Sequence, residues 1–326
     1  PSERFALVKL CAGGLRVGML SKPVGSMASN AAVPTRNVFD NNFLHAGGRA
    51  FPEGVGVWIG HANHTTVTHN EIADFYYSGV SNGWVWGYGE NPAHHNVITH
   101  NHIHHIGRNK LSDMGGIYNL GIQPGSILRF NHIHHVDSYK YGGWGLYTDE
   151  GSSQILLEKN LVHDTTSGNF DQHYGRDNVV RNNIFAFSKQ DQLTLTRPEE
   201  HISFTFRNNI VILDNGRVTN INWTRGKMTS DKNVYFDIQG NPLQFGQLDF
   251  ETWQSLERDT NSLIADPKFT DAEARDFTLA EDSPALALGF EPFDVEDAGL
   301  YGDAAWTSLP EGLTYAPLET PAPRDE

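Results

Sequence analysis

The chain has 326 residues, a formal net charge of −15 at pH 7, 32 glycines and only 19% charged residues. Its length suits one elongated domain, and this composition is more typical of a turn-rich β protein than of a helical bundle. The negative charge repels phosphate backbones and no basic patch offsets it, which excludes a nucleic-acid partner. No apolar run is long enough to span a bilayer, so no membrane partner is expected.

Residues 1–36 come before the first clear repeat, and we expect them to form an incomplete N-terminal coil or cap. Gly13, Gly14, Lys22 and Pro23 interrupt this segment, unlike the apolar core of an intact signal peptide. A solenoid with a bare end coil would expose apolar surface and unpaired strand edges. We therefore expect a missing upstream domain or a partner chain to cover this end.

A tripeptide of asparagine, any residue and an apolar residue recurs from there on. It starts at intervals of 22 to 31 residues, at Asn41, Asn70, Asn101, Asn131, Asn160, Asn182, Asn208 and Asn233. The apolar members are Phe43, Ile72, Ile103, Ile133, Val162, Ile184, Ile210 and Tyr235. Such a recurrence indicates a solenoid in which each repeat is one coil, the apolar residues form an internal column and the asparagines form a ladder at one corner.

The repeat excludes two other architectures. A leucine-rich repeat needs a leucine-dominated consensus, and a propeller needs longer, four-stranded repeats. We predict an all-β fold, a single-stranded right-handed parallel β-helix of the pectate-lyase-like type with eight to nine coils, over residues 37–270. Residues 271–326 are expected to form the last coil, a C-terminal cap and a disordered tail from Pro317.

A second strand of each coil is visible at Gly116-Ile117-Tyr118 and, 29 residues later, at Gly145-Leu146-Tyr147. Because side chains alternate across a strand, Ile117 and Leu146 are predicted to point inward. The same alternation places Tyr118 and Tyr147 on the exposed outer face.

Sixteen histidines suggest a metal site at first sight. The repeat, however, places His104, His134 and His163 in the same position of successive coils, stacked at about 4.8 Å. Three collinear imidazoles are poor ligands for one ion whose ligand distances are near 2.0 Å. The sequence therefore predicts surface or hydrogen-bonding histidines, with no bound transition metal and no cofactor.

The candidate catalytic residues are carboxylates next to the second strand. Asp113 precedes Tyr118 by five residues, and Asp149 and Glu150 follow Tyr147 on the adjacent coil. An acid close to a glycine is common in turns, but these acids converge on one face of neighbouring coils. Trp144 lies on the same coil as Asp149, and the next coil adds Asp171, His173 and Arg176. Together with the two tyrosines, these residues are predicted to form a sugar-binding floor.

Paired carboxylates suit glycoside cleavage, because one donates a proton to the leaving oxygen while the other stabilises or attacks the oxocarbenium-like centre. Asp113 and Asp149 are the candidates for these roles, with Glu150 as the alternative acid; which of them donates the proton stays open. Replacing either aspartate by asparagine is expected to abolish hydrolysis and to leave stability nearly unchanged, because both residues are expected to face outward.

Residues 37–290 resemble bacterial right-handed parallel β-helix proteins related to glycoside hydrolase family 141. The resemblance rests on four segments, Ser112–Tyr118, Tyr141–Ser152, Gln172–Arg176 and Arg181–Ile184. It implies activity on xylan or on α-L-fucosides of pectic glycans, with two aspartates that match Asp113 and Asp149. The chain is shorter than such enzymes and lacks their N-terminal part.

Two alternatives to a hydrolase stay open. A polysaccharide lyase would use Arg176, Lys140 or His173 as the base and often Ca²⁺, although the acidic net charge opposes a polyuronate substrate. A non-catalytic glycan-binding or structural β-helix would bind an oligosaccharide or polysaccharide without turnover. Each role on plant cell-wall glycan implies a secreted or periplasmic protein.

Overall fold

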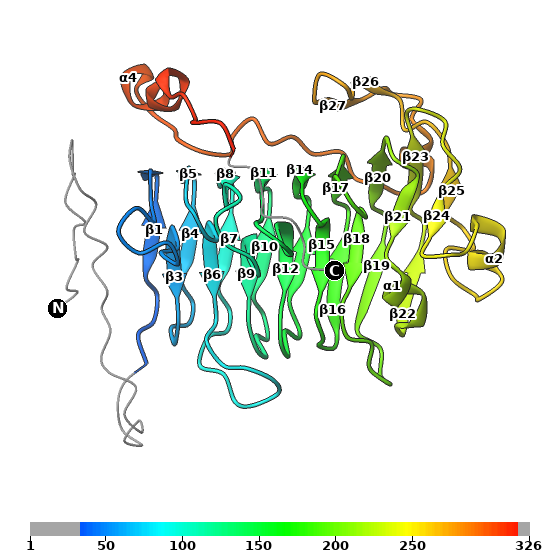
Figure 1. Cartoon of the computed structure of the whole chain (residues 1–326), viewed down its shortest axis with the longest axis horizontal. Coiled ribbons are helices and arrows are strands. Elements are labelled where there is room, and N and C mark those ends of the chain that lie inside the picture. The colour runs from blue at the N-terminus through cyan, green and yellow to red at the C-terminus, as the bar shows by residue number, and fades with distance from the viewer. Residues whose placement is uncertain (1–32, 319–326) are drawn as a thin grey trace. The chain divides into compact units, whose positions relative to one another are not determined.

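The computed structural model describes residues 33–318 and confirms the predicted β-helix. Each coil contributes one strand to each of three parallel sheets, and the first sheet counts eight strands (Figure 1). Residues 1–32, most of the expected N-terminal coil, lie outside the described residues. The strands of the first described coil are β1, β2 and β3, and each is the edge strand of its sheet.

The three sheets follow in order around each coil. The first sheet comprises β1 (Val38–Asp40), β4 (Thr66–Thr68), β7 (Val97–Thr99), β10 (Ile127–Arg129), β13 (Leu156–Glu158), β16 (Asn178–Arg181), β19 (Phe204–Arg207) and β22 (Met228–Asp231). The second sheet comprises β2 (Phe43–His45), β5 (Glu71–Ala73), β8 (His102–Ile106), β11 (His132–Val136), β14 (Leu161–Thr165), β17 (Ile184–Ala186), β20 (Ile210–Leu213), β23 (Val234–Asp237) and β25 (Leu263–Ile264). The third sheet comprises β3 (Val57–Ile59), β6 (Val80–Asn82), β9 (Gly115–Asn119), β12 (Trp144–Thr148), β15 (Gly168–Gln172), β18 (Leu193–Leu195), β21 (Arg217–Thr219) and β24 (Gln244–Phe245).

Short elements complete the described chain. An antiparallel hairpin pairs β26 (Phe269–Asp271) with β27 (Asp276–Leu279). The helices are α1 (Ile221–Arg225), α2 (Phe250–Gln254), α3 (Pro284–Ala287), α4 (Ala304–Thr307) and the 3-10 helix η1 (Leu309–Gly312). None of the helices within residues 33–318 is long and apolar enough to cross a membrane.

A buried asparagine ladder runs along the corner between the first and second sheets. The side chain of Asn101 donates to Asn131 Oδ1 at 3.0 Å, and Asn131 donates to Asn160 Oδ1 at 2.9 Å. Each of these side chains also donates to a backbone carbonyl of the coil before, for example Asn131 Nδ2 to Ile98 O. The ladder therefore satisfies backbone groups that the corner would otherwise leave unpaired and buried.

The predicted register is wrong by one residue wherever two asparagines are adjacent. At these corners the ladder uses the second asparagine of the pair, namely Asn42, Asn183 and Asn209. The first asparagine of each pair, at Asn41, Asn182 and Asn208, has a positive φ of 52° to 56°. Asparagine tolerates this left-handed bend, which turns the chain into the corner, so the sequence repeat began one residue early.

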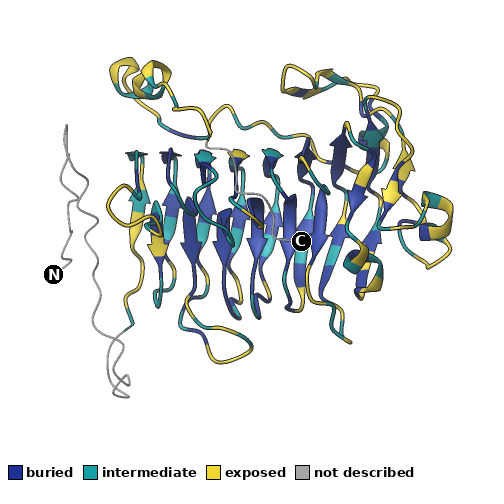
Figure 2. Ribbon diagram, in the orientation of Figure 1, coloured by how far each residue is buried: buried dark blue, intermediate teal, exposed yellow. Residues whose placement is uncertain are grey.

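The shift also changes which residues fill the interior at those three coils. The internal column of the second sheet contains Leu44, Phe185 and Val211 in place of the predicted Phe43, Ile184 and Ile210. The other predicted members are in register, as the pairing of Ile103 with Ile133 shows. Ile184 and Ile210 are nevertheless buried, because they pack outside the sheet with residues of the C-terminal segment. Burial is concentrated in the strands (Figure 2).

The C-terminal segment, residues 265–318, follows the last strand of the solenoid. The last solenoid strand ends at Ile264, and a later stretch of the chain returns along the outer face of the second sheet to the first coil (Figure 1). The first asparagine of each Asn-Asn pair, which is outside the ladder, holds this stretch in place. Asn208 donates to Leu288 O, Asn182 to Glu291 O and Asn41 to Tyr301 O. At the C-terminal end of the solenoid, α2 packs against the core through Trp253, which is fully buried. Most of the tail predicted from Pro317 lies outside the described residues.

Candidate active site

The outer face of the third sheet carries a column of polar and aromatic side chains. Strand register aligns Tyr118 with Tyr147, Tyr147 with Asp171, and Asp171 with Thr194. The alternating residues Ile117 and Leu146 are fully buried in the core, as predicted. The tyrosines thus point away from the interior of the coil on adjacent strands, and the candidate acids lie around them.

Asp149 lies one residue after β12, and two side chains contact its carboxylate. His173 Nδ1 is 2.7 Å from Asp149 Oδ1, and the Tyr118 hydroxyl donates to Asp149 Oδ2. The nearby hydroxyl of Tyr147 also lowers the pKa of this carboxyl. Asp149 is therefore held in one position by Tyr118 of its own sheet and by an imidazole from the next coil.

Asp113 reaches the same place from the other side of the column. It lies before β9 with a φ of 57°, and this left-handed bend turns the chain back toward Tyr147. The Tyr147 hydroxyl donates to Asp113 Oδ1 at 2.9 Å, and the Tyr77 hydroxyl donates to its backbone carbonyl at 2.7 Å. Asp113 thus enters the site although five residues separate it from Tyr118.

The two carboxyl groups have pKa values shifted in opposite directions. Burial raises the pKa of Asp113, and the negative charge of Asp149 raises it further, against one hydrogen bond from Tyr147 that lowers it. Burial also acts to raise the pKa of Asp149, but hydrogen bonds from His173, Tyr118 and Tyr147 together bring it below its ordinary value. Asp113 therefore keeps its proton to a higher pH than Asp149 does.

The expectation of an exposed tyrosine floor is wrong. Tyr118 is 7% exposed, Tyr147 3% and Asp149 5%. Trp144, also buried, covers Tyr147 with its ring centroid at 4.3 Å. Alternation fixed only which side of the sheet these residues occupy, and the large neighbouring side chains then removed them from solvent.

Burial also changes the expectation that Asp149→Asn leaves stability nearly unchanged. Asp149 forms an ion pair with His173, and its side chain is only 6% exposed. The pKa of His173 is raised, first by its hydrogen bond to Asp149, so the imidazolium form is favoured. Removing the carboxylate would leave that charge without its partner, which carries a stability cost.

Other predicted residues occupy separate places around this pair. Glu150 is partly exposed and accepts a hydrogen bond from the Tyr174 hydroxyl at 2.9 Å. Arg176 contacts the ring of Tyr88, with the guanidinium carbon 5.3 Å from the ring centre. Glu150 therefore lies one residue from the pair, whereas Arg176 flanks it.

Asp171 is fully buried beside Tyr147 and lacks full hydrogen-bonding. The hydroxyls of Thr194 and Thr196 donate to its Oδ1, whereas Oδ2 has no hydrogen-bond partner among the described residues. Burial raises the pKa of Asp171 to about 7. Asp171 is fully buried, so it packs beside Tyr147 rather than contacting a sugar.

Sequence reasoning missed an exposed aromatic group beside the acids. Trp58, Trp84 and Trp86 are 40%, 38% and 52% exposed, and their rings follow one another at 5.3 and 5.0 Å. The segment reaches the site because Gly87 N donates to Glu150 O at 3.2 Å. Gly151 has a φ of 75°, and a Cβ there would collide with the Gly87 carbonyl. The alternation Trp84-Val85-Trp86-Gly87-Tyr88 was the available signal.

No family model and no curated protein matches the chain. A solved structure named "Glycoside hydrolase" is 29% identical to it, with a TM-score of 0.37. The match covers 41% of this chain and 23% of that structure, so the chain spans less than a quarter of its length. The resemblance to family 141 stays a prediction.

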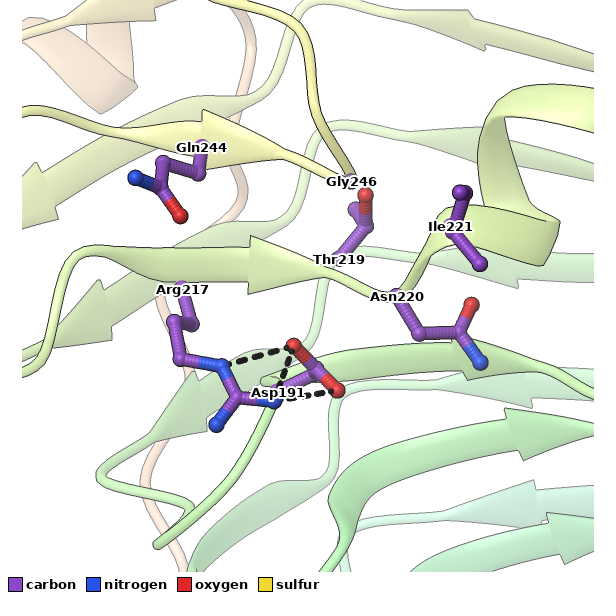
Figure 3. A pocket seen from close by; sticks show the side chains of 7 residues that line it. All are labelled: Asp191, Arg217, Thr219, Asn220, Ile221, Gln244 and Gly246. Carbon is purple, nitrogen blue, oxygen red and sulfur yellow. Dashed lines mark hydrogen bonds and ion pairs between the residues drawn. The ribbon is translucent and has the colours of Figure 1, made fainter.

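A hollow of about 290 Å³ lies farther along the third sheet, among residues that β21 and β24 contribute (Figure 3). Arg217 points across it to Asp191, and two hydrogen bonds of 3.1 Å join them. Thr219, Asn220, Ile221, Gln244 and Gly246 complete the lining. Because its acid is already neutralised by an arginine, this hollow offers no free carboxylate pair.

Two groups of side chains with metal-ligating atoms occur in the described part of the chain, both on the second sheet. One group is Glu71, His102 and His104, and the other is His102, His132 and His134. Neither includes a residue of the carboxylate site.

Proposed function

We propose that this protein is a carbohydrate-active enzyme that hydrolyses glycosidic bonds with Asp113 and Asp149. The observation that carries the proposal is the pair itself, two carboxyl groups on either side of one tyrosine hydroxyl with pKa values shifted in opposite directions. Glycoside cleavage needs a carboxylic acid and a carboxylate at the same pH, and such tuning supplies both.

The shifts assign a role to each group. Asp113, with its raised pKa, donates its proton to the leaving glycosidic oxygen. Asp149, with its lowered pKa, supplies the negative charge that attacks or stabilises the anomeric carbon. Asp113 then takes a proton from the water that completes hydrolysis, so the site returns to its starting state.

The substrate we propose is a plant cell-wall glycan, either xylan or an α-L-fucoside of a pectic or xylan-type glycan. The aromatic group Trp58, Trp84 and Trp86 supports a carbohydrate, because exposed rings contact the apolar faces of sugars. His173 and Glu150 are partly exposed next to the pair and suit hydrogen bonds to sugar hydroxyls. A polymeric substrate of this kind implies a secreted or periplasmic enzyme.

The lyase alternative needs a neutral base, and His173 is poorly suited to that role. Its hydrogen bond to Asp149 raises its pKa and thus favours the protonated form. Arg176 is an even weaker base because guanidinium stays protonated in proteins. A hydrolase is therefore the better account of the same residues.

A panel of plant polysaccharides and aryl glycosides tests the proposal. Incubation should release new reducing ends without the ultraviolet absorbance of an unsaturated product, and a chelator should leave the rate unchanged. An unsaturated product would establish a lyase instead. Binding in a glycan array without any turnover, unaffected by Asp149→Asn, would show a non-catalytic carbohydrate-binding protein.

A further inference from the structure

The outer face of the second sheet carries two adjacent columns of histidines. Strand register aligns His102 with His132 in one column, and His104 with His134 and His163 in the other. Ring centroids along the second column are 4.9 Å apart at both steps, so the predicted stack is confirmed.

Nitrogen atoms from the two columns converge. His102 Nε2 lies 2.8 Å from His134 Nε2, although the two residues belong to different coils and different columns. One ring nitrogen from each of His102, His132 and His134 lies within 4.8 Å of the other two. The three imidazoles thus form a triangle, which removes the geometric objection that collinear histidines cannot share an ion.

We propose that His102, His132 and His134 bind one divalent transition-metal ion of the Zn²⁺, Co²⁺, Ni²⁺ or Cu²⁺ type. Tetrahedral coordination at about 2.0 Å places ligand nitrogens roughly 3.3 Å apart. The His102–His134 nitrogen distance is 2.8 Å, and the distances from these two to the His132 nitrogen are at most 4.8 Å. Side-chain shifts of about 1 Å therefore complete the site. Imidazole nitrogen is a preferred ligand for each of these ions.

Glu71 supports the site as an orienting partner. His102 Nδ1 is 2.9 Å from Glu71 Oε2, and a proton on Nδ1 directs the lone pair of Nε2 toward His132 and His134. Metal-ligating histidines usually donate their second ring nitrogen to a carboxylate in this way. This contact favours the three-histidine group over the overlapping group in which Glu71 is itself a ligand.

A protonation change is needed at His134 and its neighbour allows it. In the absence of a metal, a proton between His102 Nε2 and His134 Nε2 accounts for their 2.8 Å contact. When the ion binds, that proton moves to Nδ1 of His134, and His135 Nδ1 lies 2.6 Å away to accept its hydrogen bond.

The C-terminal segment covers part of this surface. Gly299 has a φ of 101°, and a Cβ there would lie 3.0 Å from Glu71 Oε2 and 3.2 Å from His102 Cβ. The ring of Tyr315 stacks on His105 at 3.8 Å. A bound ion would therefore lie next to this segment. Its binding free energy would stabilise the folded protein.

Metal titration of untagged, chelator-treated protein tests the proposal. We expect one Co²⁺ per chain with the visible absorption of a nitrogen-rich, four- or five-coordinate site, displaced by Zn²⁺. His102→Ala and His134→Ala should each weaken binding at least about 10-fold, and Glu71→Gln about 10- to 100-fold with unchanged stoichiometry. His64→Ala, in a separate stack with His95, is the matched control and should bind as the parent protein does.

X-ray absorption of the Zn²⁺-loaded parent protein gives a test that needs no variant. Scattering from three imidazoles is the expected result. Sub-stoichiometric binding, equal affinity in the His134→Ala protein, or a spectrum dominated by oxygen ligands would overturn the proposal and leave the histidines as a hydrogen-bonded stack. Because the site lies on a different sheet from the aspartates, these outcomes do not depend on the proposed hydrolase activity.

Discussion

The outer faces of the third and second sheets use the same types of residue in opposite proportions. On the third sheet, Asp149 accepts from His173 inside a group of acids, and the pKa of that histidine rises. On the second sheet, Glu71 contacts His102 and His104, and the pKa of His104 falls because burial lowers it first and the neighbouring imidazole of His102 lowers it further. Burial and neighbouring charges thus shift the pKa of a histidine in opposite directions on the two faces.

The two faces also differ in how regular they are. The histidine columns follow the strand register, so each member repeats the position of the one before. The carboxylate pair breaks the register, because Asp113 enters from the segment before β9 and Asp149 leaves from the end of β12. A repeated frame gives a stack of equal groups, whereas acid–base chemistry needs unequal groups, which irregular segments supply.

The largest expected effect separates the pair from every other acid. Asp113→Asn and Asp149→Asn should each lower kcat by about 10²- to 10⁴-fold, because each removes one half of the acid–base pair. Glu158→Gln, which removes an ion pair with Arg181 on the first sheet, is the control and should retain activity. Steady-state kinetics on the substrate found in the polysaccharide panel measures this. Full activity in either aspartate variant would exclude that residue as catalytic.

Stability should respond most strongly in the asparagine ladder. Asn131→Ala removes a side chain that donates to Asn160 and accepts from Asn101, all fully buried, so we expect a loss of about 1 to 3 kcal/mol in the free energy of unfolding. Asn261→Ala, at an exposed position, should change it by less than about 0.5 kcal/mol. Urea denaturation compares the two, and equal values would show that the ladder does not stabilise the coils.

Asp149→Asn should also destabilise the protein, by about 1 to 2 kcal/mol, since it removes the partner of a partly exposed imidazolium.

The contribution of this pair depends on pH. The lowered pKa of Asp149 makes its share present above about pH 4 and lost as pH falls through the folded value. The raised pKa of His173 makes its share complete below about pH 6.5 and lost as pH rises through the folded value. The difference in unfolding free energy between the parent and Asp149→Asn proteins should therefore be greatest between about pH 4 and 6.5; a difference that keeps growing toward pH 9 would contradict the ion pair.

Removing the Tyr147 hydroxyl should have a smaller effect, which is a shift in the pH profile of activity. The Tyr147 hydroxyl lowers the pKa of both Asp113 and Asp149 by hydrogen bonding. In Tyr147→Phe both pKa values should rise, so the acidic limb, set by Asp149, and the alkaline limb, set by Asp113, should both move to higher pH. Profiles of kcat/KM that move in opposite directions, or that do not move, would show that Tyr147 does not link the two groups.

The smallest expected effect concerns the exposed tryptophans. Trp86→Ala should raise KM by roughly 2- to 10-fold with little change in kcat, because an aromatic contact contributes about 0.5 to 1.5 kcal/mol. Trp306→Ala, on the C-terminal segment beside Asn41, is the matched control. An equal effect of both replacements would remove the aromatic group from the substrate-binding surface.

The sequence predicted the coils well because the asparagine and apolar repeat is a local pattern that each coil restates. The predicted register was wrong at Asn41, Asn182 and Asn208, where either of two adjacent asparagines could join the ladder. The left-handed backbone bend at the first asparagine places the second one in it. At the site, alternation predicted the side of the sheet for Tyr118 and Tyr147 but not their burial. Burial and the Tyr147 bridge depend on contacts between coils, which no single repeat contains.

We propose that Asp113 and Asp149 differ in pKa, so that Asp113 is the acid and Asp149 the carboxylate of the pair. Titration of both carboxyl carbons by carbon-13 NMR, in protein labelled at aspartate and assigned with the two asparagine variants, measures this difference. We expect Asp113 to titrate above the ordinary aspartate pKa of 3.8 and Asp149 below it. The reverse order, or two carboxyls that titrate together at the ordinary value, would contradict it.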